Sequence, residues 1–102
     1  MLLSYAKKDG SKVKIRVREV SSAPAVTIGR DSTATVQLDD AKCSRIHTAI
    51  RYWDDVFVVR DMKSHNGTYL NDKKLLRPKA LYDWDEIRIG RTLFIFRGSK
   101  IA

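Results

Sequence analysis

Four short clusters of polar residues carry the side chains that could do chemistry. Each cluster lies in a loop at the end of a predicted strand, where binding residues concentrate on a rigid scaffold. The four clusters are Gly29-Arg30, residues 44–47, residues 64–68 and Asn71-Asp72. Arg30 offers a planar, permanently charged fork that matches a phosphate or a carboxylate, and the Ser44 hydroxyl can donate to the same anion. The clusters therefore predict an anion-binding site built on loops.

Taken one at a time, these clusters have simpler interpretations. A single Gly-Arg pair is more often a turn that carries a solvated arginine. Asn66-Gly67 is a typical turn dipeptide, in which glycine accepts a positive φ and asparagine offers both a donor and an acceptor. His47 is more often a hydrogen-bonded structural histidine than a base or a metal ligand. The binding hypothesis depends on the four clusters together.

Catalysis would have to use Ser44 with His47, or Cys43 with His47. If this segment is a strand, Ser44 and His47 face opposite sides, whereas Cys43 and His47 share a side but lie too far apart to bond. With one cysteine and two histidines in the chain, a structural zinc site is also excluded in practice. We therefore expect a binding module that has no enzymatic activity, no metal and no cofactor.

The elements that must position these clusters are predicted to be short strands. Residues 12–18 alternate charged and β-branched side chains, which is typical of a strand with one apolar face and one solvent-exposed face. Asp9-Gly10 is a hairpin turn signal that links this strand to an opening strand, and Asp54-Asp55 and Gly90-Arg91 are placed like later hairpin turns. The other predicted strands are residues 2–5, 26–28, 36–38, 52–53, 56–59, 86–89 and 92–96. Many short strands of this kind favour an all-β sandwich or barrel.

Residues 41–51 fit two patterns. Cys43, Ile46, Ala49 and Ile50 recur at helical spacing, yet the same segment also alternates between two sides. Periodicity cannot decide for so short a run. A helix in a basic domain would favour a helix-turn-helix protein, whereas the all-β surroundings favour a strand. We therefore expect a strand.

Length and composition bound the class of protein. The chain has 102 residues, of which 43% are hydrophobic and 31% are charged, and this is the length of one folded domain. No apolar run approaches the ~18 residues of a membrane-spanning helix, and the first residues contain no signal-peptide core. Cys43 is the single cysteine, so an internal disulfide is impossible and a reducing compartment is favoured. We expect a cytoplasmic protein without membrane attachment.

The net charge of +8 is unevenly distributed along the chain. Residues 1–20 carry 6 − 2 = +4, residues 21–72 carry 6 − 7 = −1, and residues 73–102 carry 8 − 3 = +5. A basic domain attracts nucleic acid through its field. However, many of these charges alternate with apolar residues, which is typical of a solvated sheet face. We expect no specific nucleic-acid partner, and a basic β domain that binds nucleic acid non-specifically stays an alternative.

The order and spacing of the clusters resemble those of the forkhead-associated (FHA) domain. That family has a Gly-Arg loop, then Ser-Arg-x-His, then a Ser-x-Asn-Gly-Thr loop, and an asparagine after one more short strand. This chain has IGRD, CSRIH, SHNGTY and LN in the same order, followed by LYDWDEIRIG near its end. The resemblance covers about residues 2–97. It implies a two-sheet β-sandwich of short, mostly antiparallel strands with ligand-binding loops at one end.

The resemblance also implies a function, which is recognition of phosphothreonine peptides in signalling. The partner would be a protein phosphorylated by a Ser/Thr kinase. By the resemblance, Arg30 and Ser44 contact the phosphate, and Arg45 contributes nearby, partly through its backbone. Asn66 holds the peptide main chain, and His65 helps to frame the phosphothreonine. The residues that the resemblance assigns to shaping the loops are Gly29, His47, Gly67 and Asn71. The alternative within the same fold is a phosphorylation-independent interaction or assembly domain.

Three positions depart from the family pattern. Position 65 is histidine where serine, threonine or lysine is commoner, and positions 72 and 84 are aspartate and tryptophan where glycine is usual. Lys42 and Lys63 precede the two binding loops and could favour acidic residues beside the phosphothreonine. We expect residues 1–97 to form the FHA domain, and residues 98–102 to form a short tail of the kind that can lead into a longer native chain.

Overall fold

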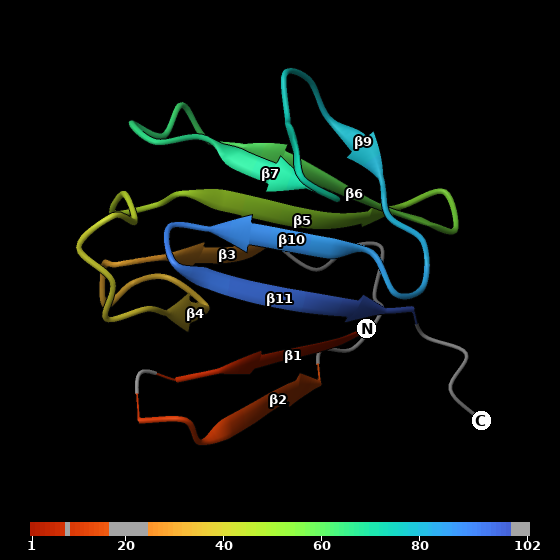
Figure 1. Ribbon diagram of the computed structural model, residues 1–102. Helices are drawn as coiled ribbons and strands as arrows, with labels where there is room; N and C mark the ends of the chain where they lie inside the picture. Colours follow the sequence, from red (N-terminus) through yellow and green to blue (C-terminus); the bar gives the residue numbers. More distant parts are fainter. Residues whose placement is uncertain (8, 17–24, 99–102) are drawn as a thin grey trace.

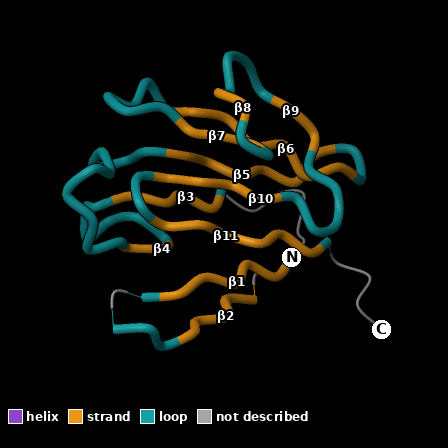
Figure 2. The backbone as a smooth tube through the Cα atoms, viewed as in Figure 1, coloured by secondary structure: helices purple, strands orange, loops and turns teal. Residues whose placement is uncertain are grey.

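The computed structural model describes residues 1–7, 9–16 and 25–98. Within these residues there are two β-sheets and no helix (Figures 1 and 2). The strands are β1 (Leu2–Ala6), β2 (Lys12–Arg16), β3 (Val26–Gly29), β4 (Val36–Gln37), β5 (Thr48–Trp53), β6 (Val56–Asp61), β7 (Thr68–Leu70), β8 (Lys73–Lys74), β9 (Lys79–Ala80), β10 (Glu86–Ile89) and β11 (Thr92–Arg97). The predicted all-β fold is confirmed.

The two sheets form a sandwich. One sheet has the strand order β2-β1-β11-β10-β7-β8, and the other has the order β4-β3-β5-β6-β9. The pairing of β3 with β4 is parallel, and the other described pairs are antiparallel. The hairpins predicted between β1 and β2, β5 and β6, and β10 and β11 are present. Strands β7, β8 and β9 have two or three residues each, too few to show an alternation in the sequence.

The turns between strands contain residues in the left-handed region of φ. Asp54 and Asp55, between β5 and β6, have φ values of 53° and 63°. Two successive residues of this kind form the turn whose twist matches that of the flanking strands. Asp72 and Trp84, where the FHA pattern has glycine, have φ values of 68° and 71°. The backbone therefore keeps at both positions the conformation that glycine adopts most easily.

The core lies between the two sheets and consists of side chains from alternate strand positions. Ile87 and Ile89 of β10 are fully buried, while their neighbours Glu86 and Arg88 are exposed. Phe96 of β11 is also buried in the same core. Burying each such side chain contributes about 1.5–3 kcal/mol relative to leaving it exposed. Strand β2 shows the same alternation, with its three cations exposed, as expected for a solvated sheet face.

The strand prediction for residues 41–51 is wrong over its first half. Strand β5 begins at Thr48, and residues 41–47 form turns and bends. Hydrogen bonds within the loop stabilise this course, because Cys43 N–H donates to the Asp40 carbonyl and Ser44 N–H donates to the His47 ring. Ser44 therefore lies in a loop, four residues before the strand.

Some predictions concern residues outside the described part of the chain. They are the end of the strand at residues 17–18, the loop at residues 21–24, and the tail beyond Gly98. The structure describes no helix with the length and apolar character needed to cross a membrane.

Candidate functional site

Three loops meet at one end of the sandwich (Figure 1). They are the segment after β3, the segment before β5, and the connection between β6 and β7. The first two are joined through their backbones, because Arg30 N–H donates to the Ser44 carbonyl and Asp31 N–H donates to the Arg45 carbonyl, both at 3.0 Å. The Arg30 side chain adds a third link, from Nε to the Cys43 carbonyl at 3.1 Å. Arg30, Ser44 and Arg45 therefore lie side by side.

The third loop contacts the second through the predicted site residues. His65 N–H donates to Ser44 Oγ at 3.1 Å. Asn66 Nδ2 donates to the Lys42 carbonyl at 2.8 Å. The structure thus brings together the five residues that the sequence assigned to the binding surface. Arg30, Arg45, His65 and Asn66 are exposed, and Ser44 is half-buried.

Gly29 allows the first two loops to approach each other. A Cβ atom at this position would lie 1.9 Å from the Arg45 carbonyl oxygen, far inside the contact distance of any side chain. Both the oxygen and the atoms around it are backbone, so the clash could not be relieved by a rotamer change. Any larger residue at position 29 would therefore separate Arg30 from the loop that holds Ser44.

His47 is completely buried behind these loops. Its Nδ1 accepts the Ser44 N–H at 3.0 Å, so in the neutral ring the proton is on Nε2, which lies 2.8 Å from the Gly67 carbonyl. The ring therefore joins the second loop to the third. The expectation that Ser44 and His47 face opposite sides of a strand is wrong, because the bend at residues 44–47 turns the Ser44 backbone toward the ring.

This geometry contains no activated nucleophile. Both ring nitrogens of His47 are bonded to backbone groups, and Ser44 Oγ accepts a hydrogen bond from the His65 backbone. The Cys43 thiol donates to the Ser44 carbonyl. Burial, with an added contribution from the nearby Asp40 carboxylate, raises the pKa of Cys43 to about 11, so the thiol stays protonated at neutral pH.

Asp61, at the end of β6, organises the third loop. Its carboxylate accepts hydrogen bonds from Ser64 N–H at 3.0 Å, Ser64 Oγ at 2.6 Å and Thr68 Oγ1 at 2.6 Å. Burial by itself raises the pKa of this carboxyl, but the hydrogen bonds from Ser64 and Thr68 outweigh that effect and hold the pKa below its usual value. Thr68 Oγ1 also lies 2.9 Å from Thr48 Oγ1, which connects the loop to β5 in the other sheet.

Asp40 organises the second loop in a similar way. Its carboxylate accepts from Lys42 N–H at 2.9 Å and from Arg91 N–H at 2.7 Å, and its side chain is almost fully buried. Burial favours a higher pKa, yet the backbone hydrogen bonds from Arg91 and Lys42 keep the pKa of Asp40 below its usual value. Asp40 therefore anchors the loop before β5 to the turn between β10 and β11.

Asp40 and Asp61 were not among the candidate residues of the sequence analysis. A local signal exists for Asp61, because aspartate side chains in turns often accept hydrogen bonds from the backbone that follows, as Asp61 does from Ser64 N–H. The main partner of Asp40 is Arg91, 51 positions away in the chain, so no local pattern could reveal that contact.

Asn71 lies on a different turn from the binding loops. Its Nδ2 donates to Asp85 Oδ1 at 3.0 Å, and its Oδ1 accepts from Glu86 N–H at 2.9 Å. It stabilises the start of β10.

Lys42 and Lys63 are exposed on the second and third loops. Within the described part of the chain, no His, Cys, Asp and Glu side chains gather as a metal site requires.

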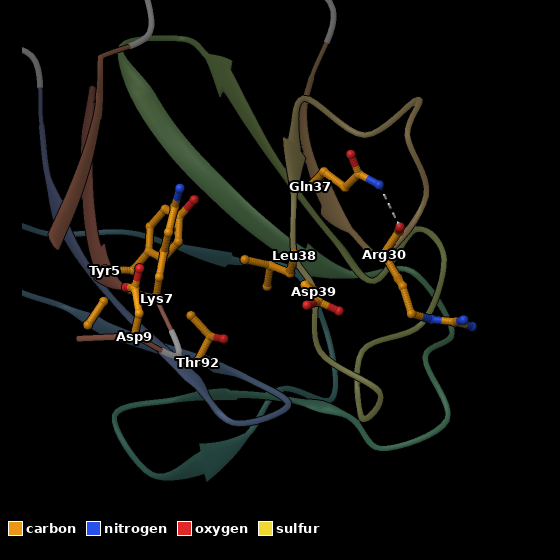
Figure 3. Close-up of a pocket in the computed structure, with 9 residues that line it drawn as sticks. Tyr5, Lys7, Asp9, Arg30, Gln37, Leu38, Asp39 and Thr92 are labelled. Carbon is orange, nitrogen blue, oxygen red and sulfur yellow. Dashed lines mark hydrogen bonds between the residues drawn. The ribbon is translucent and has the colours of Figure 1, made fainter. Parts of the chain in front are cut away.

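A cavity of about 590 Å³ borders the site on one side (Figure 3). It lies between the β1–β2 hairpin and the chain around β4, and its lining includes Tyr5, Gln37 and Thr92. Arg30 contributes mainly its backbone, whose carbonyl accepts from Gln37 Nε2 at 3.3 Å, while its side chain points away from the cavity (Figure 3). Ser44, His65 and Asn66 do not line it, so the five residues form an exposed surface beside this cavity.

Comparisons with known proteins agree on one family. The family model described as FHA domain matches residues 26–90. The oxoglutarate dehydrogenase inhibitor of Corynebacterium diphtheriae is 37% identical over 72% of this chain and 50% of that protein. The chain spans about half the length of the corynebacterial inhibitor proteins that it matches.

Solved structures lead to the same family. An FHA-domain structure from work on phosphothreonine-dependent FHA interactions is similar with a TM-score of 0.76 and 28% identity, over 99% of this chain and all of that one. The FHA domain of FhaA, crystallised with the intracellular domain of another protein, has a TM-score of 0.76 and 32% identity, over 91% of this chain and 97% of that one. Together with the loop geometry, these matches establish that the chain belongs to the FHA domain family.

Proposed function

We propose that this FHA domain, residues 1–97, binds phosphothreonine-containing segments of partner proteins and so mediates phosphorylation-dependent protein–protein interaction. The observation that carries the proposal is the convergence of Arg30, Ser44 and Asn66, from three loops, on one exposed surface. The FHA structures that this domain resembles come from work on phosphothreonine-dependent interactions and from a complex with a protein partner.

The chemistry of the surface suits a phosphate group. A phosphothreonine carries about −1.5 to −2 charges and three acceptor oxygens. The Arg30 Nε is already bonded to Cys43, and among the described residues its terminal amino groups have no recorded partner, so they are free to donate outward. Ser44 Oγ accepts one backbone N–H and still has its own proton to donate. Arg45, exposed next to Ser44, adds positive charge.

The third loop supplies contacts for the peptide around the phosphate. Asn66 uses its Nδ2 on the Lys42 carbonyl, which orients its Oδ1 and leaves that oxygen to accept a peptide N–H. His65 is exposed beside Ser44, in a position to border the threonine side chain. Gly29, His47 and Gly67 set the loop positions through close backbone approach and buried hydrogen bonds, and Asn71 stabilises a neighbouring turn.

Binding of this kind needs neither catalysis nor a cofactor. The ligand would contact loop tips only, so the buried area is small and the affinity modest and reversible. The partner would be phosphorylated by a Ser/Thr kinase inside the cell, and the free thiol of Cys43 is consistent with such a reducing location.

The test is a degenerate peptide library with a fixed central phosphothreonine, screened on the purified domain beside its unphosphorylated and phosphoserine counterparts. We expect binding to the phosphothreonine library and weak or no binding to the other two. Equal binding of the phosphorylated and unphosphorylated libraries would contradict the proposal and would favour a phosphorylation-independent interaction domain.

A further inference from the structure

A second cavity, of about 270 Å³, lies beside the third loop. Three cations line it, and we call it the basic cavity. Arg60 comes from the end of β6, Lys63 from the loop that follows, and Arg77 from the connection between β8 and β9. All three residues are exposed. Leu75 and Pro78 supply apolar walls, and the buried Leu75 side chain fixes that connection to the core.

The protein offsets only part of the positive charge of the basic cavity. Its one acidic lining residue, Asp61, carries one negative charge against the three cations, and the carboxylate already accepts hydrogen bonds from Ser64 and Thr68. Among the described residues, the structure records no ion pair for Arg60, Lys63 or Arg77. Like charges held around one small cavity repel each other, so the arrangement favours an anionic ligand.

The backbone at Lys63 is held in one conformation by the loop. Lys63 has a φ of 55°, in the left-handed region that few residues other than glycine, asparagine and aspartate adopt. The Asp61 hydrogen bonds to Ser64 close the turn around it and hold the lysine in this conformation. The turn therefore fixes the point from which the Lys63 side chain leaves the backbone.

The basic cavity is close to the proposed phosphothreonine surface. Lys63 and His65 belong to one loop, and two residues span at most ~7 Å between their Cα atoms. An extended peptide of a few residues can therefore reach from one to the other. We propose that the basic cavity is a second subsite for the same phosphopeptide, which binds one further anionic group, a carboxylate or a second phosphate, a few residues from the phosphothreonine. This inference rests on the proposed function.

Guanidinium groups suit either anion, because their paired N–H donors match two oxygens of a carboxylate or a phosphate. Since all three cations are exposed to solvent and salt, the gain in affinity should be moderate. The subsite would therefore select among phosphothreonine ligands and would not by itself capture an acidic peptide.

The experiment uses short peptides that carry one phosphothreonine in an otherwise neutral sequence. At each position on either side, one neutral residue is replaced in turn by glutamate, by phosphoserine, or by glutamine as the uncharged control, and the Kd is measured by fluorescence anisotropy. We expect one position, or two adjacent ones, where an anionic residue strengthens binding by about threefold to tenfold, the size of one or two exposed ion pairs. The glutamate and phosphoserine arms show which anion is preferred.

The same peptides are then measured on Arg60→Ala, Arg77→Ala and the double variant. Arg16→Ala is the matched control, because Arg16 is an exposed arginine on β2, at the edge of the other sheet. The gain should disappear in the double variant and persist in Arg16→Ala, while the neutral phosphothreonine peptide binds all four proteins alike. Thermal melting checks that the folds are equally stable.

The outcomes separate the two proposals. Phosphate-dependent binding with no gain at any position, or a gain that survives the double substitution, would overturn the basic-cavity subsite and leave the proposed function standing. Equal binding of phosphorylated and unphosphorylated peptides would overturn both.

Discussion

Two groups of polar residues lie at the loop end of the sandwich, and they differ in burial. His47, Thr48 and Thr68 have no solvent exposure, and each has a hydrogen-bond partner inside the protein. Arg30 and His65, on the first and third loops, are exposed. We call the first group the buried brace and the second the exposed surface.

The difference follows from the cost of desolvation. A buried polar group without a partner destabilises the fold, so residues of the buried brace must be fully bonded. Residues of the exposed surface keep their solvation and can exchange water for a ligand at little cost. The brace holds the surface in one geometry, which reduces the conformational entropy lost on binding. Substitutions should therefore divide into those that affect affinity and those that affect stability.

The largest effect should come from Arg30 in the exposed surface. Arg30→Ala should weaken phosphopeptide binding by about 2–5 kcal/mol, because the phosphate loses a charged hydrogen-bonding partner. The melting temperature should change little, since the side chain is exposed. Titration calorimetry and thermal melting measure the two quantities. Arg30→Lys serves as the control, because it keeps the positive charge but removes the planar guanidinium group. Unchanged affinity in Arg30→Ala would show that Arg30 does not belong to the binding site.

The two histidines allow a matched test of brace against surface. His47→Ala leaves two backbone groups, the Ser44 N–H and the Gly67 carbonyl, without their partner, and should lower the free energy of unfolding by about 2–4 kcal/mol. His65→Ala should change it by less than about 0.5 kcal/mol, because His65 is exposed and its recorded contact uses the backbone. Urea denaturation measures both. If His47→Ala kept wild-type stability yet lost binding, His47 would belong to the exposed surface.

Asp61, which accepts a hydrogen bond from Thr68 of the buried brace, makes the stability of the fold depend on pH. Its pKa in the folded state lies below the usual value of 3.8, so it stabilises the fold above that pH, and the contribution is lost as the pH falls through the lowered pKa. Asp61→Asn should be less stable than wild type by about 1–2 kcal/mol at neutral pH, because it loses the charged acceptor. Urea denaturation from pH 7 downward should show this difference shrinking below about pH 4. A difference that stays constant would mean that the charge of Asp61 contributes nothing.

The smallest effect on peptide affinity should come from the basic edge strand β2. Lys12, Lys14 and Arg16 are exposed there, at the edge of one sheet, and none of them belongs to the three loops. Replacing all three with glutamine should remove most nucleic-acid binding at low salt and change the phosphopeptide Kd by less than about twofold. Filter binding across a salt series, beside calorimetry, checks both. Tight nucleic-acid binding that resists salt and requires these three residues would instead support a nucleic-acid function.

The sequence predicted most of the strands because their alternation is local. The charged and apolar residues of β2, and the turns at Asp54-Asp55 and Gly90, need only neighbours in the chain to be recognised. The loop at residues 41–47 was predicted as a strand because its surroundings are all β, although its course depends on side-chain to backbone hydrogen bonds made by Asp40 and His47. Those bonds have no periodic signature.

The candidate site likewise has one part that the sequence predicted and one part that it did not. The exposed residues were predicted through the resemblance, because their order along the chain is itself the family pattern. The contacts that hold these exposed residues in place were not predicted, because the two partners of each contact are distant in sequence. Examples are the contacts of Asp40 with Arg91 and of His47 with Gly67. The basic cavity combines Arg60 with Arg77, and only the folded arrangement of β6 and the β8–β9 connection brings them together.

The most direct test of the division between brace and surface is an NMR titration of the ¹⁵N-labelled domain with a phosphothreonine peptide. We expect the largest shift changes at the backbone amides of Arg30, Ser44, Arg45, His65 and Asn66, and small changes along β2 and at the turn containing Trp84. The unphosphorylated peptide should cause none of them. Equal changes with both peptides, or changes centred on β2, would contradict the account.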